Sequence, residues 1–381
     1  MSQRRSDIDW LRVMAVAMLV PFHTGMIFCL WGFHLKNDEL SVALTVQNAF
    51  INLWHMPLFF FLSGASAWLA LDFRRFGEYA RERASRLMLP FFFGLAAMCP
   101  PQLYFERLQK GEFSGSFIKF YPHFFNGPYP EGNLSWQHLW FLLYLFLMSM
   151  IAIPILRYLR SERGQAVRDK LASLASRRTA IIALPLPFLV IQCVAGEGWP
   201  NGDQNLIGDM DNFAQHFFVF LYGCMLCSSD KFWRGAEKNR LFFGIAGIAC
   251  FATTQAIEYS DAINVVRGNP AAGIGWLILR AVGTWGLLLS ILGYGKRHLN
   301  FTNKFLKYAS EAALPFYIIH QTVIIIIGYY VVQTGWSVAT KYLIVVVASF
   351  GGTALAYETL VRRWAATRFL FGMRMKKCRR A

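Results

Sequence analysis

An arginine and a histidine lie eleven residues apart in the first apolar run of the chain, Trp10–Phe33. In a helix, Arg12 and His23 would share one face, three turns and roughly 16 Å apart along the axis. A guanidinium at the mouth of a membrane span can bind nucleotide phosphates, and an imidazole deeper in the span can act as a general base on a hydroxyl group. The alternative is structural, with Arg12 as an interfacial anchor and His23 as a hydrogen-bonded bundle residue.

A second pair of cations, Arg83 and Arg86, lies one helical turn apart in the segment RERASRLMLP. This spacing places both guanidinium groups on one side of a helix, where they could clamp a phosphate. Positive residues also anchor the cytoplasmic ends of membrane spans, so the spacing alone leaves both interpretations open.

Three further ionisable residues, His138, His320 and Glu358, lie in other apolar runs. Such residues are costly in lipid, so they mark a bundle interior or a functional site. We expect His320 about 15 Å from the inner end of its span, at a depth comparable with His23. His138 and Trp136 lie near an outer end, on the side where an acceptor would bind, although His138 could equally serve as an interfacial hydrogen-bonded residue. For Glu358 the default expectation is an ion pair with one of the arginines named above.

Motifs of several other chemistries are absent or weak. The sequence has no GxSxG, GxxxxGK[ST] or HExxH, which argues against an elbow hydrolase, a nucleotide-driven pump and a zincin. Cys224 and Cys227 form a CxxC without a second ligand pair, so we interpret them as packing residues and predict no metal site. His34 and Asp38 form an HxxxD, a combination common by chance.

The composition indicates the environment that surrounds these residues. Of the 381 residues, 55% are hydrophobic and only 16% are charged, more apolar surface than a soluble core would bury. The net charge is +16, but the basic residues lie between apolar runs instead of on one exposed face, which argues against nucleic-acid binding. The sequence therefore predicts an all-α polytopic membrane protein in contact with a lipid bilayer.

Ten apolar runs are long enough to cross a bilayer. They are Trp10–Phe33, Val42–Leu71, Leu87–Phe105, Trp136–Tyr158, Thr179–Ala195, Asn212–Ser228, Leu241–Glu258, Ala272–Gly295, Ala309–Gln333 and Val338–Leu360. Lysine and arginine collect in alternate connections, which predicts that the N- and C-termini are both cytoplasmic. We expect residues 1–381 to form a single integral-membrane domain without a soluble domain.

The order of several short segments resembles the acyltransferase family 3 of integral membrane acyltransferases, and within it the periplasmic glucan succinyltransferases. These segments are DIDWLRVMAVAMLVPFHTGMIF, FFFLSG, RERASRLMLP, QHLWFLL, PFYIIH and LAYETLVRR followed by FLFG, and they extend over nearly the whole chain. The resemblance implies that His23 is the essential histidine and Arg12 its partner, with Arg83 and Arg86 as the arginines of the third span. His138, His320 and Glu358 match recurrent positions.

The resemblance also implies a reaction and its partners. The expected donor is cytoplasmic acyl-CoA, with succinyl or acetyl as the acyl group, and the expected acceptor is a hydroxyl of a periplasmic or cell-surface glycan. No permanently bound cofactor is expected, and the location would be the bacterial inner membrane. A homo-oligomer is compatible with the sequence.

The residues alone leave other functions open. Ten spans with buried histidine, arginine and glutamate also suit a proton-coupled transporter or exporter, although no inverted repeat is visible. A receptor or scaffold with purely structural polar residues is a third alternative. Within the acyltransferase hypothesis, direct transfer and an acyl-histidine intermediate both remain open.

Overall fold

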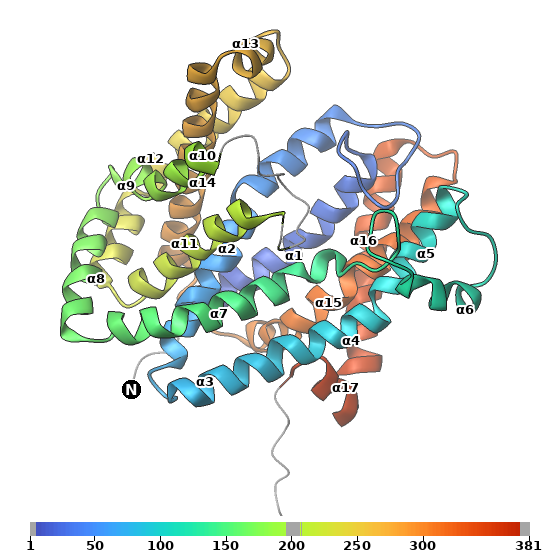
Figure 1. Cartoon of the computed structure of the whole chain (residues 1–381), viewed down its shortest axis with the longest axis horizontal. Helices are drawn as coiled ribbons and strands as arrows, with labels where there is room; N and C mark the ends of the chain where they lie inside the picture. The colour runs from blue at the N-terminus through green and yellow to red at the C-terminus, as the bar shows by residue number, and fades with distance from the viewer. Residues whose placement is uncertain (1–4, 196–205, 207, 374–381) are drawn as a thin grey trace, which may run out of the picture. The chain divides into compact units, whose positions relative to one another are not determined.

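The computed structural model describes residues 5–195, 206 and 208–373, and these residues form helices joined by turns and loops (Figure 1). The all-α polytopic fold is confirmed, because eight helical segments of the described chain are long and apolar enough to cross a membrane. These segments are α1 (Ser6–Phe28), α2 (Val42–Ala70), the composite segment Phe76–Gln109, η3 with α7 (Gln137–Leu159), α12 (Asp230–Glu258), α14 (Pro270–His298), α15 (Lys304–Val332) and α16 with η5 (Val338–Val361).

The expected fifth and sixth spans differ from this pattern. The fifth is divided into α9 (Ala180–Ala183) and α10 (Leu186–Ala195), and the segment Ala180–Val190 is bent by 119° relative to α8 (Glu162–Ala175). The sixth corresponds to α11 (Met210–Leu226), which has only 17 residues. The described chain therefore offers eight spans, or nine if the bent pair counts as one, instead of ten. Both ends of the chain, for which a cytoplasmic location is expected, lie outside the described residues.

The composite third span carries the arginine pair. It consists of α3 (Phe76–Arg83), the π-helical turn η1 (Ala84–Met88), α4 (Leu89–Ala97) and α5 (Cys99–Gln109). Prolines lie in the first turns of α4 and α5, where the backbone N–H group that proline lacks would have no partner within the helix. The π-helical turn contains Arg86, and such turns are frequent at functional sites.

The chain divides into two compact units. The first comprises the described part of Met1–Arg12 together with Phe50–Ala80 and Leu147–Asn303. Within it, α12 and α14 run side by side, and α13 (Ala262–Gly268) joins them at one end (Figure 1). A Cβ atom at Gly286 would lie 2.9 Å from the Cα atom of Gly247, so these two helices approach closely only because both positions are glycine.

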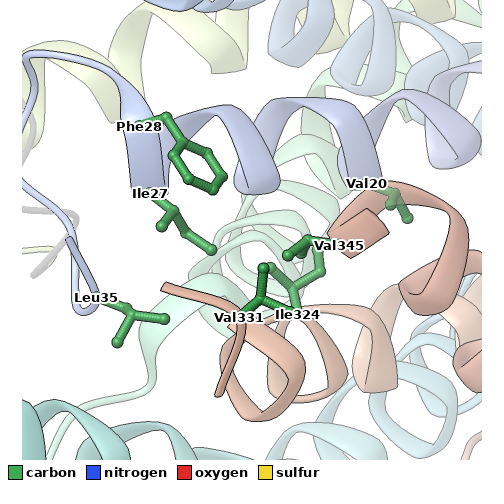
Figure 2. Close-up of a cluster of buried hydrophobic side chains, with 7 residues drawn as sticks. All are labelled: Val20, Ile27, Phe28, Leu35, Ile324, Val331 and Val345. Atoms are coloured by element: carbon green, nitrogen blue, oxygen red, sulfur yellow. The ribbon is translucent and has the colours of Figure 1, made fainter. Parts of the chain in front are cut away.

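The second compact unit comprises Val13–Ala49, Arg81–Phe146 and Lys304–Ala381. A cluster of buried apolar side chains packs α1 against α15 and α16 in this unit, as Figure 2 shows. The members from α1 lie on either side of His23 along the helix, so the cluster fixes the segment of α1 that carries this histidine. The cluster consists of Val20, Ile27, Phe28, Leu35, Ile324, Val331 and Val345.

Candidate active site

Three histidines from three helices come together in the second compact unit. The Nε2 atom of His320 lies 3.1 Å from the Nδ1 atom of His23, although the two residues are 297 positions apart in the sequence. The ring of His138 meets the ring of His320 edge-on, with centroids 5.2 Å apart. His320 and His138 are buried, whereas His23 is partly exposed, so His23 is the member of this histidine cluster that a substrate can reach.

Backbone carbonyl groups orient the two buried rings. The Nδ1 atom of His320 lies 2.6 Å from the carbonyl oxygen of Tyr317, and the Nε2 atom of His138 lies 3.1 Å from that of Ile318. The phenol of Tyr317 donates in return to the carbonyl oxygen of His138. His138 is thus a buried, hydrogen-bonded residue that joins η3 (Gln137–Leu139), which precedes α7, to α15. Within the described residues, no group of three histidine, cysteine or acidic side chains is arranged to hold a metal ion.

Buried amides extend the polar region around the histidines. The side-chain nitrogen of Gln102 on α5 donates to the hydroxyl of Thr322 at 2.9 Å, and the oxygen of Gln102 accepts from Gln321 at 3.0 Å. Sequence analysis did not identify these residues, because a neutral amide in an apolar run gives no signal of ionisable chemistry. Their hydrogen bonds satisfy buried polar groups that would otherwise destabilise the bundle.

The α2 helix holds the opposite flank of the α1 segment. The amide of Asn48 donates to the carbonyl oxygen of Phe22 at 3.1 Å, directly beside His23. A Cβ atom at Gly25 would lie 2.3 Å from the side-chain oxygen of Asn48, so this approach requires glycine at position 25. The backbone around the accessible histidine is therefore fixed from two sides.

Arg12 lies on the same helix as His23 but belongs to the first compact unit. There it forms a 3.2 Å ion pair with Asp9 and donates to the hydroxyl of Ser66 at 2.6 Å. About a third of its side-chain surface remains exposed, at 32%. Arg12 is thus oriented by Asp9 and Ser66 on its own unit.

One member of the arginine pair, Arg86, contacts the last described segment of the chain. Arg86 donates to the carbonyl oxygen of Gly372 at 3.2 Å and forms a 3.3 Å ion pair with Glu82, and Arg83 closes the preceding helix α3. Gly372 has a φ of +65°, and a Cβ atom there would lie 2.7 Å from the carbonyl oxygen of Arg86. The glycine of FLFG is therefore required for the chain to pack against the π-helical turn.

Glu358 has a different partner from the expected one. It lies in the second π-helical turn, η5 (Tyr357–Val361), and accepts hydrogen bonds from Arg362 at 2.9 and 3.1 Å. Beside it, the buried Arg368 of α17 (Ala365–Leu370) forms a 2.8 Å ion pair with Glu311. The ionic pairing expected at the end of the last span is present, but its arginine comes from the same turn of helix.

A buried carboxylate at the end of α5 is the main polar site that sequence analysis missed. Glu106 has no exposed side-chain surface and pairs with His34 and, at 2.7 Å, with Lys110. The phenol of Tyr129 also donates to Glu106, at 3.3 Å. Burial lowers the pKa of Lys110, but the hydrogen bond and the charge of Glu106 outweigh it, so the pKa lies above its ordinary value.

His34 gave a partial signal for this site. In the sequence it forms an HxxxD with Asp38, whereas its partner in the structure is Glu106, 72 positions away. Burial and, after it, the negative charge of Glu106 raise the pKa of Tyr129.

Trp136, expected on the acceptor side, is partly buried and packs beside Phe91 with ring centroids 6.3 Å apart.

Comparison with known proteins identifies the family. Residues 5–358 match the acyltransferase domain of acyltransferase family 3, a range that contains the histidine cluster and the arginine pair. Glucans biosynthesis protein C of Escherichia coli O139:H28 is 23% identical over 388 residues, which cover 97% of this chain and 94% of the relative. The protein of the same name from Escherichia coli O1:K1 is 23% identical over 383 residues, with the same coverage. No solved structure matches the chain. The chain therefore belongs to acyltransferase family 3, and it is an integral membrane acyltransferase.

Proposed function

We propose that the protein is a bacterial inner-membrane O-acyltransferase that moves an acyl group from cytoplasmic acyl-CoA to a hydroxyl of a glycan on the other side of the membrane. The observation that carries this proposal is the position of His23. It is the partly exposed member of the histidine cluster, and its Nδ1 atom lies 3.1 Å from His320. A general base needs such a combination of access and fixed orientation.

In the proposed reaction, His23 removes the proton from the acceptor hydroxyl. The alkoxide oxygen attacks the thioester carbonyl carbon, the carbon–sulfur bond breaks, and the CoA thiolate leaves with the proton that His23 held. General-base catalysis of this kind contributes roughly 10²- to 10⁴-fold to a rate. Transfer through an acyl-histidine uses the same residue and remains the alternative route.

Arg83 and Arg86 are the residues that we propose for binding the phosphate groups of the donor. Arg86 keeps 41% of its side-chain surface exposed, and its neighbours Glu82 and Gly372 fix the direction of its guanidinium. Arginine suits this role because its planar fork binds phosphate oxygens in pairs. The family resemblance also implies a role of Arg12 in binding the donor, and Glu358 would act indirectly by orienting Arg362.

The orientation of the chain and the identity of the acceptor belong to the same proposal. Lysine and arginine collect in alternate connections between the apolar runs, which favours cytoplasmic termini and, with them, a position of the arginine pair on the donor side. The relatives are named for glucan biosynthesis, which supports a glycan acceptor. Succinyl or acetyl is the acyl group that the family resemblance implies, and we keep it as part of the proposal. Trp136 would face the acceptor, while the buried His138 would support α15 from the same end of α7.

The test is thermal stabilisation of the detergent-purified protein by a panel of CoA thioesters. A ligand that binds only the native state at 100 times its Kd stabilises it by about 2.7 kcal/mol. We expect stabilisation that is selective for one thioester and lost in Arg83→Ala and Arg86→Ala.

The matched control is Arg81→Ala, which removes an exposed arginine from the same helix as Arg83. This variant should still be stabilised by the thioester, because the loss of Arg81 changes the local charge but not the proposed phosphate contacts. The absence of stabilisation by every CoA compound would contradict the donor assignment. Equal loss in all three variants would show a general effect of charge instead of a site.

A further inference from the structure

We infer that His320 is a positioning residue that fixes His23 in the tautomer with its proton on Nδ1 and stabilises the imidazolium formed during transfer. The inference deepens the proposed function and rests on it, because it gives His320 a part in the same reaction. It follows from the hydrogen-bond partners of each ring nitrogen in the histidine cluster.

The protonation of His320 follows from its contact with the backbone. Its Nδ1 atom lies 2.6 Å from the carbonyl oxygen of Tyr317, and a carbonyl oxygen can only accept a hydrogen bond. Nδ1 therefore carries the proton. In a neutral imidazole the other nitrogen then keeps its lone pair, so Nε2 of His320 is an acceptor.

The neutral form of His320 is the one that its surroundings favour. The side chain has no exposed surface, and burial of an unpaired charge is strongly unfavourable. Its partners include His23, His138, Tyr317 and the backbone of Phe316, none of which carries a carboxylate. Nothing among these groups would compensate a positive charge on the resting ring.

The protonation of His23 then follows from that of His320. Its Nδ1 atom faces two acceptors, the carbonyl oxygen of Leu19 and the Nε2 atom of His320, each at 3.1 Å. Nδ1 must therefore carry the proton, and Nε2 is the nitrogen that keeps the lone pair. Since the Leu19 carbonyl oxygen also lies in the hydrogen-bonding pattern of α1, His320 is the acceptor that is specific to this contact.

His138 secures the turn of α15 that orients His320. It contacts the carbonyl oxygen of Ile318 through Nε2 at 3.1 Å, and it receives the hydrogen bond of the Tyr317 phenol at its own carbonyl oxygen. The carbonyl group that fixes the His320 tautomer belongs to Tyr317, and His138 forms hydrogen bonds both with the phenol of this residue and with the carbonyl oxygen of the next one, Ile318. His138 therefore acts on His23 indirectly, through Tyr317 and then through His320.

The arrangement has a defined role during transfer. The acceptor proton moves to Nε2 of His23, which makes the ring positive, while the proton on Nδ1 stays in the hydrogen bond to His320. That bond becomes charge-assisted and therefore stronger at the moment when the base is charged. The proton on Nε2 then moves to the leaving thiolate, and His320 is neutral before and after. A buried carboxylate plays the corresponding part in serine hydrolases, where it sets the tautomer and stabilises the imidazolium.

Two substitutions of His320 separate its role as the hydrogen-bond acceptor for His23 from its role as the donor to Tyr317. His320→Gln places an amide oxygen near the position of Nε2, so it can still accept from His23. His320→Asn has a shorter side chain, whose amide reaches only the region of Nδ1 and can donate to Tyr317 without accepting from His23. We expect kcat to fall by about 10²-fold in His320→Asn, at the low end of the range for general-base effects, and by less than about 10-fold in His320→Gln. The KM for acyl-CoA should change little in either variant.

The second readout is the tautomer itself, measured by nitrogen NMR of protein labelled with ¹⁵N-histidine, with the His23 signals assigned from His23→Gln. We expect a protonated Nδ1 and an unprotonated Nε2 on His23 in the wild type and in His320→Gln, and a larger fraction protonated on Nε2 in His320→Asn. Equal kcat values in folded Asn and Gln variants would overturn the inference, as would a wild-type His23 protonated on Nε2. A wild type with the expected tautomer but without acyl transfer would instead overturn the proposed function and leave the tautomer assignment supported.

Discussion

Glu106 allows a substitution whose energetic effect can be worked out from its contacts. The change is Glu106→Gln, which keeps the shape of the side chain but removes its charge from the pairs with His34 and Lys110. The carboxylate has no exposed surface, while His34 and Lys110 keep 11% and 43% of their side chains exposed. Breaking a fully buried pair costs about 3–5 kcal/mol, and exposed pairs contribute about 0–1 kcal/mol. We therefore expect the free energy of unfolding to fall by about 2–3 kcal/mol, an intermediate value, since Lys110 is largely solvated.

The assay is thermal unfolding in detergent, followed by a dye that reacts with cysteine thiols as they become exposed. Cys29, Cys99, Cys224 and Cys227 are buried in the folded protein, so the signal rises on unfolding. For a chain of this length, each kcal/mol corresponds to roughly 1–2 °C, so the apparent Tm should fall by about 2–6 °C at a fixed scan rate.

The matched control is Glu112→Gln, which removes a carboxylate with 48% of its side chain exposed from an ion pair with Arg107. We expect a change of less than about 1 kcal/mol in this variant, because a surface pair contributes little. Equal Tm values for Glu106→Gln and the wild type, or equal losses in both variants, would refute the reasoning that burial gives the Glu106 pairs their strength.

Three further predictions follow from contacts in the second compact unit. Gly372→Ala should destabilise by about 1–3 kcal/mol, because of its positive φ and the approach to Arg86, and should raise the KM for acyl-CoA in steady-state assays. Lys36→Met should lower the apparent Tm by about 2–4 °C, since the ammonium group donates to three carbonyl oxygens at the end of α1, and Lys36→Arg should recover part of that loss. The raised pKa of Lys110 means that its pairing with Glu106 contributes fully below the unfolded pKa and is lost as pH rises through the folded value, above 10.5. Unfolding curves between pH 9 and 12 should therefore show a smaller alkaline loss of stability in Lys110→Gln than in the wild type.

The order of the spans was predictable because lipid requires about 20 apolar residues for each crossing. Hydropathy counts residues but carries no information on axis direction, so the bend of 119° between α8 and the segment Ala180–Val190 was not visible in the sequence. Pro185 lies at the break between α9 and α10, and it could have indicated the interruption. A single proline is a weak signal, however, since Pro21, Pro57 and Pro315 lie inside continuous helices.

The candidate site was predictable by residue type but not by partner. His23 and His320 were expected at similar depths, yet their direct contact depends on packing between α1 and α15 that no local pattern encodes. Glu358 was expected to pair with arginine, and its partner Arg362 is set by the local helical turn instead of by a distant segment. The buried Glu106 was missed because it lies at the end of an apolar run, where a carboxylate is common.

The most direct test of His23 catalysis is transfer of an isotope-labelled acyl group from acyl-CoA to a glucan acceptor by the purified protein in liposomes. We expect labelled glucan with the wild type and a rate lower by about 10²- to 10⁴-fold with His23→Ala, in a preparation whose thermal unfolding shows that the variant is folded. Unreduced transfer by folded His23→Ala would contradict the account.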